Sequence, residues 1–74
     1  MDVDLMKLIR DLVKYLKLPP EMYFARCDYI SSVDEIFFRF MYNDAETILR
    51  ISNAAMTRPF DERVKILQKQ IDDV

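Results

Sequence analysis

The chain carries its densest run of aromatic residues at Ile36-Phe37-Phe38-Arg39-Phe40-Met41-Tyr42. Aromatic side chains lose rotamer freedom in a helix but pack well on the pleated, half-buried surface of a sheet. The segments 22–30 and 47–53 on either side hold further aromatic and β-branched residues, and short polar stretches separate them from the central run. This pattern predicts an antiparallel meander with strands over residues 22–30, 35–42 and 47–53.

Side chains alternate between the two faces of a strand, so the meander also predicts which residues share a face. In the first strand, one face is expected to carry Tyr23, Ala25, Cys27 and Tyr29. The other two strands form a hairpin whose loop is Asn43-Asp44-Ala45-Glu46, which pairs Phe38 with Ile51, Phe40 with Leu49 and Tyr42 with Thr47. The opposite, outer face then carries Phe24, Arg26, Asp28, Phe37, Arg39, Met41, Arg50 and Ser52.

A helical interpretation of the same middle segment is the alternative. Ser32-Val33-Asp34-Glu35 matches a capping box, in which a serine and a glutamate satisfy the first backbone amides of a helix. Apolar residues then follow at helical spacing from Val33 to Met41. The chain also contains no glycine, the residue that two-residue hairpin turns usually require. This alternative predicts an all-α bundle of four to five short helices.

The N-terminal segment is predicted to form a helix from Asp2 or Val3 to Lys17. Its leucines recur every three or four residues, which places them on one helix face. Pro19 and Pro20 end the helix, because proline disfavours helical geometry in the residue before it and has no backbone N–H to donate.

The C-terminal segment predicts a second helix that begins near Pro59, since proline suits the first helical position. Its apolar stripe consists of Phe60, Val64, Leu67, Ile71 and Val74. The order of helix, strands and helix predicts one small α+β domain over residues 1–74, with both helices on one side of a three-stranded sheet.

Composition excludes several classes of function. The chain has no histidine and one cysteine, Cys27, so catalysis by Ser-His-Asp or Cys-His groups is excluded. We therefore expect no enzymatic activity, no cofactor and no metal centre. The net charge of −2 is too mild to indicate a nucleic-acid partner. No apolar run is long enough to span a membrane, and the acidic N-terminus is unlike a secretory signal, so we expect a cytoplasmic protein.

Two surfaces are candidates for binding. The first is the outer face of the sheet, where Phe24, Phe37 and Met41 lie among Arg39 and Arg50 and are expected to contact a partner protein. Its alternative role is cross-strand ion pairing, chiefly of Asp28 with Arg39 or Arg26. The second is a basic face of the first helix, where an acidic partner or a phosphate backbone would dock unless it is an ordinary solvated face. It carries Lys7, Arg10, Lys14 and Lys17.

Two further features have structural explanations. The carboxylates Asp34, Glu35, Asp44 and Glu46 flank predicted turns, where acidic and amide side chains bond to the local backbone. Cys27 is expected to be a small buried apolar residue and not a nucleophile, because no side chain that would lower its pKa shares its face.

The functional prediction follows from the amount of apolar residue in so short a chain. About half of the 74 residues are apolar, and a small domain has too high a ratio of surface to volume to bury them all. We expect a non-enzymatic protein–protein interaction module, an adaptor, inhibitor or regulator, that forms a homodimer. The alternative is a nucleic-acid-associated regulator that uses the basic face. No motif of a known family is present in the sequence.

Overall fold

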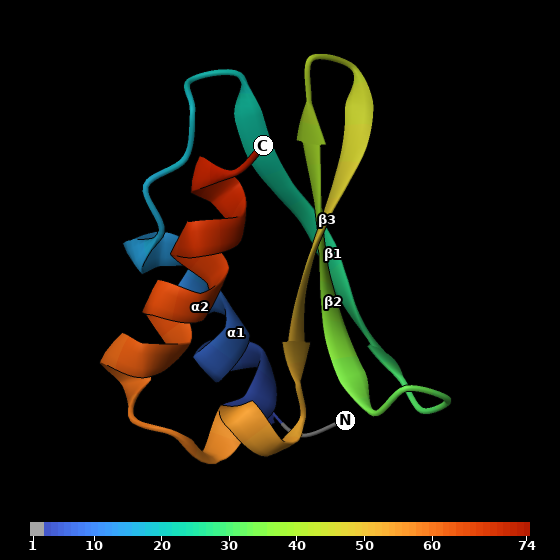
Figure 1. The fold of residues 1–74 in the computed structure, drawn as a ribbon, viewed down its shortest axis with the longest axis vertical. Coiled ribbons are helices and arrows are strands. Elements are labelled where there is room, and N and C mark those ends of the chain that lie inside the picture. The colour runs from blue at the N-terminus through green and yellow to red at the C-terminus, as the bar shows by residue number, and fades with distance from the viewer. Residues whose placement is uncertain (1–2) are drawn as a thin grey trace.

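Two helices pack on one face of a three-stranded antiparallel sheet (Figure 1). The computed structural model describes residues 3–74, and their side chains from residue 7 onward. The elements in chain order are α1 (Val3–Tyr15), β1 (Met22–Ile30), β2 (Glu35–Tyr42), β3 (Ala45–Ser52), the short 3-10 helix η1 (Ala54–Thr57) and α2 (Phe60–Asp72). The α+β prediction is confirmed, and the all-α alternative is wrong. Whether the first helix includes Asp2 lies outside the described residues.

Helix α1 ends at Tyr15, two residues before the predicted end at Lys17. Leu16 closes the last turn with a backbone bond of 3.1 Å from its N–H to the Val13 carbonyl. The backbone of Lys17 then pairs with the side chain of Gln68 on α2 instead of continuing the helix. A competing partner from another element therefore ends the helix before the prolines do.

The β2–β3 hairpin has a two-residue turn, not the predicted four-residue loop. Asn43 and Asp44 have φ angles of 52° and 64°, and such a pair of positive values defines the type I′ turn that matches the twist of a hairpin. Asparagine and aspartate tolerate this left-handed conformation better than other non-glycine residues. The glycine-free sequence therefore still makes a tight hairpin.

The shorter turn shifts the register of the hairpin by two residues. Phe38 lies opposite Leu49 and Phe40 opposite Thr47, whereas the four-residue loop predicted Ile51 and Leu49 as their partners. A shift of two residues keeps each side chain on its predicted face, because faces alternate with a period of two. The predicted pairs were wrong, and the predicted faces of these two strands are confirmed.

Strand β1 contains a bulge between Phe24 and Arg26. Ala25 is the extra residue, and it reverses the alternation of the residues before it. Phe24 therefore lies on the inner face, where its ring centroid is 5.4 Å from that of Phe40, and Tyr23 lies on the outer face. The predicted outer position of Phe24 was wrong, because a bulge leaves no signature in an alternating pattern.

The residues of the predicted capping box form the turn between β1 and β2 instead of starting a helix. The N–H groups of Val33 and Asp34 donate to the carbonyls of Ile30 and Ser31, both at 3.3 Å. Asp34 has a φ of 53°, and its carbonyl accepts the N–H of Asn53 at 2.9 Å. The turn is thus tied to the chain that follows β3.

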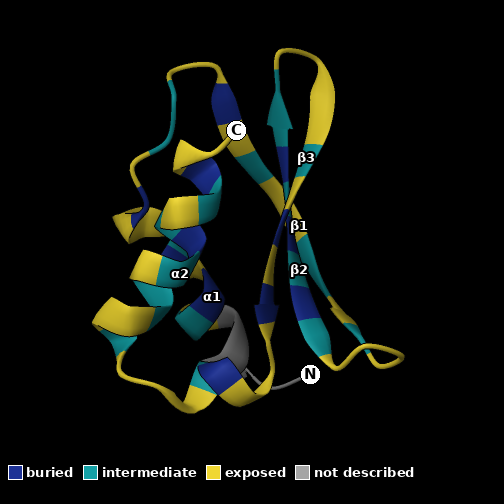
Figure 2. Cartoon of the chain, in the orientation of Figure 1, coloured by how far each residue is buried: buried dark blue, intermediate teal, exposed yellow. Residues whose placement is uncertain are grey.

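The core lies between the helices and the inner face of the sheet. Phe38, Phe40, Leu12, Leu49 and Leu67 are its largest side chains that are almost fully excluded from solvent. Figure 2 shows the buried positions on the sides of the helices and strands that face one another. Helix α2 packs on β3, as its apolar stripe predicted, and Val74 at the end of that stripe is 59% exposed.

Two glutamines on α2 each bind the backbone of a distant segment through both atoms of the side-chain amide. Gln70 Oε1 accepts the N–H of Arg50 at 2.8 Å, and Gln70 Nε2 donates to the carbonyl of Arg50 at 2.6 Å. Gln68 does the same with Lys17, at 2.8 and 3.1 Å. These amides tie α2 to the edge of β3 and to the α1–β1 connection. No residue pattern predicted these contacts.

Replacing Asp44 with glycine is expected to stabilise the protein. Glycine adopts positive φ without steric cost, and Asn-Gly is the preferred sequence for a type I′ turn. Relief of the strain at Asp44 should exceed the greater flexibility of glycine in the unfolded chain, for a net gain of about 0.5–1 kcal/mol. Urea unfolding monitored by circular dichroism measures the change. The matched variant Asp44→Ala should destabilise, and a loss of stability in Asp44→Gly would contradict the type I′ assignment.

Candidate functional site

The outer face of the sheet is the face opposite to the helices. Figure 1 shows both helices on one side and none on the other. We define the outer face by the residues that the register places there, which are Tyr23, Arg26, Asp28, Ile30, Glu35, Phe37, Arg39, Met41, Glu46, Ile48, Arg50 and Ser52. Tyr23 is 61% and Ile48 38% exposed, and Phe37 and Met41 are half-buried. Apolar and aromatic side chains thus reach solvent on this face.

Ion pairs link the three strands across the outer face. Arg39 on the central strand lies between two carboxylates, with Nε 2.8 Å from Asp28 Oδ2 on β1 and Nη1 3.0 Å from Glu46 Oε1 on β3. The hydrogen bond to Asp28 is the main cause that raises the pKa of Arg39. Arg26 is a second, longer partner of Asp28, at 3.3 Å. The predicted cross-strand pairing of Asp28 with Arg39 is confirmed, and the pairing of Asp28 with Arg26 lies within β1.

Arg50 joins the ionic and the aromatic parts of the outer face. Its Nη2 is 2.7 Å from Glu35 Oε1, and its Cζ lies 5.2 Å from the centroid of the Phe37 ring. A guanidinium at that distance is attracted to the ring face. Phe37 is therefore partly covered by Arg50, while the side chains of Tyr23 and Ile48 are more open to solvent.

Four of the five residues predicted to bind a partner share the outer face. These are Phe37, Arg39, Met41 and Arg50, and only Phe24 lies on the other face, against the core. Ile48 and Tyr23 are absent from the predicted set. Alternation with Arg50 would have found Ile48, whereas the position of Tyr23 depends on the bulge at Ala25 and left no signal.

The predicted basic face is only partly helical. Lys7, Arg10 and Lys14 are exposed on α1, as their spacing predicted. Lys17 is also exposed but follows the end of the helix, so its backbone position depends on Gln68. A role for these residues in binding nucleic acid stays a prediction.

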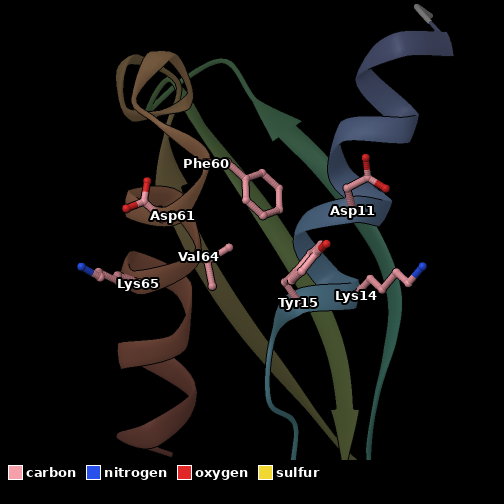
Figure 3. Close-up of a pocket in the computed structure, with 7 residues that line it drawn as sticks. All are labelled: Asp11, Lys14, Tyr15, Phe60, Asp61, Val64 and Lys65. Carbon is pink, nitrogen blue, oxygen red and sulfur yellow. The ribbon is translucent and has the colours of Figure 1, made fainter.

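An open groove of about 710 Å³ runs between the two helices (Figure 3). Tyr15 on α1 and Phe60 at the start of α2 meet there edge to face, with ring centroids 5.3 Å apart. Two acidic and two basic side chains surround these rings, namely Asp11, Asp61, Lys14 and Lys65. The mixed charges indicate no preference for an anion or a cation.

The single thiol and the turn carboxylates offer little chemistry. Burial raises the pKa of the Cys27 thiol, and the negative charge of Asp28 raises it further. The thiol therefore stays protonated at neutral pH. Glu35 and Glu46 pair with arginines, and the Asp34 carboxylate accepts the Tyr29 hydroxyl, which raises the pKa of Tyr29. Within the described residues, His, Cys, Asp and Glu side chains form no group of three that could hold a metal ion.

Comparison of this chain with known proteins gives no relative from which to classify it, so only its fold can be used. The chain matches no family model, no curated protein and no solved structure. Over residues 3–74, neither helix combines the length and the apolar character needed to cross a bilayer. The chain is therefore classed by its architecture, as a two-layer α+β domain with one face of the sheet uncovered.

Proposed function

We propose that this protein is a non-enzymatic protein–protein interaction module that binds through the outer face of its sheet. The observation that supports this is the two-layer architecture, in which the helices cover one face and leave Phe37, Met41, Ile48 and Tyr23 on the other. Apolar side chains gathered on one uncovered face are typical of interaction surfaces. The roles of adaptor, inhibitor and regulator all fit such a surface, and we propose that it acts in the cytoplasm.

A second copy of the chain is the partner that the charges of this face favour. The outer face holds equal numbers of arginines and carboxylates, namely Arg26, Arg39 and Arg50 against Asp28, Glu35 and Glu46. A balanced face does not repel an identical face, whereas a nucleic acid would require an excess of positive charge. The charges are also largely paired within the chain, which lowers the cost of removing them from water.

Light scattering coupled to size exclusion tests this proposal with Ile48→Glu. Ile48 lies opposite Arg39 on the outer face, so a glutamate there finds a cationic neighbour in the monomer but places a charge in the dimer interface. We expect the native chain to run as a dimer at tens of micromolar and Ile48→Glu as a folded monomer.

Ala54→Glu is the matched control, because it adds the same charge at an exposed site on η1, away from the outer face. It should remain a dimer. A native chain that is monomeric at tens of micromolar and binds no hydrophobic dye would contradict the proposal.

A further inference from the structure

The two edges of the sheet differ in what occupies their backbone groups. At β3, the side chain of Gln70 takes both the N–H and the carbonyl of Arg50. An edge strand whose backbone is bonded in this way has fewer free groups for another strand to pair with. Strand β1 forms the other edge.

The contact between Gln70 and Arg50 also fixes which groups of β1 point outward. Arg50 turns its backbone away from β2, so Arg50 and Phe37 are a pair without mutual hydrogen bonds. Because the N–H and carbonyl of Phe37 do not bond to β3, they point to the other neighbouring strand, where Asp28 on β1 is their partner. The neighbours of Asp28, Cys27 and Tyr29, then present their N–H and carbonyl groups to the open edge. Among residues 3–74, no backbone bond outside the helices and strands uses these groups.

An apolar pocket of about 400 Å³ lies beside this part of the edge. Its lining comes from α1, β1, β2, the β3–η1 connection and η1, and consists of Leu8, Ile9, Cys27, Tyr29, Ile36, Asn53 and Met56. Directly opposed residues of neighbouring strands point to the same face. A residue placed opposite Cys27 by an added strand would therefore direct its side chain to the pocket side of the sheet.

The outer side of the same edge carries Arg26 and Asp28, of which Arg26 is the more exposed. The side chain of Arg26 is 69% exposed, and its contact with Asp28 is the longer of the two that Asp28 makes with arginine, at 3.3 Å against 2.8 Å for Arg39. Donors of the Arg26 guanidinium remain free for another carboxylate. The bulge at Ala25 limits the regular edge to residues 26–30.

We propose that residues 26–30 and this pocket bind an extended segment of another protein that carries one carboxylate, and that the segment adds antiparallel to β1 as a fourth strand. The segment places an apolar side chain opposite Cys27 and a carboxylate beside Arg26, and it gains backbone hydrogen bonds at Cys27 and Tyr29. This inference rests on the proposed function as an interaction module. It uses the edge of β1 and shares only the side chain of Arg26 with the outer face, so the failure of one does not decide the other.

Titration of the isotope-labelled chain with the capped pentapeptide Val-Thr-Leu-Glu-Val, followed by amide resonances and hydrogen exchange, tests the inference. Added antiparallel with its leucine opposite Cys27, this peptide places the glutamate opposite Arg26 and the threonine opposite Asp28. The amides of Cys27 and Tyr29 should exchange fast in the free protein and slowly with peptide bound, while that of Asp28 is slow in both. The same residues in the order Glu-Thr-Val-Leu-Val, and the charge-reversed Val-Thr-Leu-Lys-Val, should bind at least roughly tenfold more weakly.

The variant Cys27→Pro removes the outward N–H without breaking a bond inside the sheet, since proline is tolerated at an edge. It should bind roughly tenfold more weakly than the matched Cys27→Ala, which loses the same pocket-lining thiol but keeps the N–H. If Cys27→Pro does not fold, the exchange pattern of the native chain decides alone. No protection of Cys27 and Tyr29 at millimolar peptide would overturn the inference, as would protection that grows with protein concentration in the absence of peptide.

Discussion

Phe38→Ala is expected to remove a large part of the protein's free energy of unfolding, whereas Phe37→Ala should remove little of it. Phe38 is fully buried on the inner face, and truncation of a buried phenylalanine costs about 3–5 kcal/mol through lost burial and the cavity left behind. A chain of this length typically has a free energy of unfolding of about 4–11 kcal/mol in total. Denaturant unfolding followed by circular dichroism measures the loss.

Phe37→Ala is the matched control, because it removes the same side chain from the adjacent position on the opposite face. Phe37 is half-buried beneath Arg50, so its truncation should cost only about 1 kcal/mol. Two neighbouring phenylalanines with such different effects are the signature of a strand that has only one face in the core. Equal losses for the two variants would contradict the assignment of β2.

The double variant Gln68→Ala, Gln70→Ala is expected to have the second largest effect on stability. It removes the four hydrogen bonds through which α2 holds the backbones of Lys17 and Arg50. A net contribution of about 0.5–1.5 kcal/mol per bond, reduced here by access of water to the freed groups, predicts a loss of about 2–4 kcal/mol. The free backbone at Arg50 should also make the protein more prone to aggregate, which light scattering during thermal unfolding would detect.

Lys69→Ala is the control for this pair, because Lys69 lies between the two glutamines and is exposed. Like the two glutamine substitutions, it truncates a long side chain to alanine, but it removes no bond to the backbone of another element. It should change the free energy of unfolding by less than about 0.5 kcal/mol. Gln70→Glu separates the two bonds to Arg50, since a carboxylate accepts the N–H but cannot donate to the carbonyl. A double variant as stable as the control would show that the amide contacts contribute nothing.

Residue patterns predicted the element types and most of the faces, and local geometry accounts for the errors. The aromatic run of β2 and the stripes of the helices depend on burial, which a sequence expresses directly as periodicity. The register of the hairpin depends on whether Asn43 and Asp44 take positive φ, and the sequence leaves both turn lengths open. The faces of β1 depend on the bulge at Ala25, which alternation cannot reveal.

The candidate binding surfaces were predictable to different degrees for the same reason. The outer face follows from alternation along β2 and β3, so Phe37, Arg39, Met41 and Arg50 were found together. The pocket beside Cys27 gathers residues from five parts of the chain, and only the folded structure brings them together. The glutamine contacts likewise join positions 20 and 51 residues apart in the chain.

The blocked edge at Arg50 has a consequence for how large an assembly this protein can form. Growth of a fibre by strand stacking needs two free edges on every molecule, one to receive a neighbour and one to extend. Here the Gln70 amide occupies the outward backbone groups of Arg50 on one of them, and it leaves those of Glu46 and Ile48 unbonded by this contact. A neighbouring strand that adds to β3 can therefore pair only with the part of the strand nearer the β2–β3 turn, which makes this edge a poorer template for a fibre than a fully open strand.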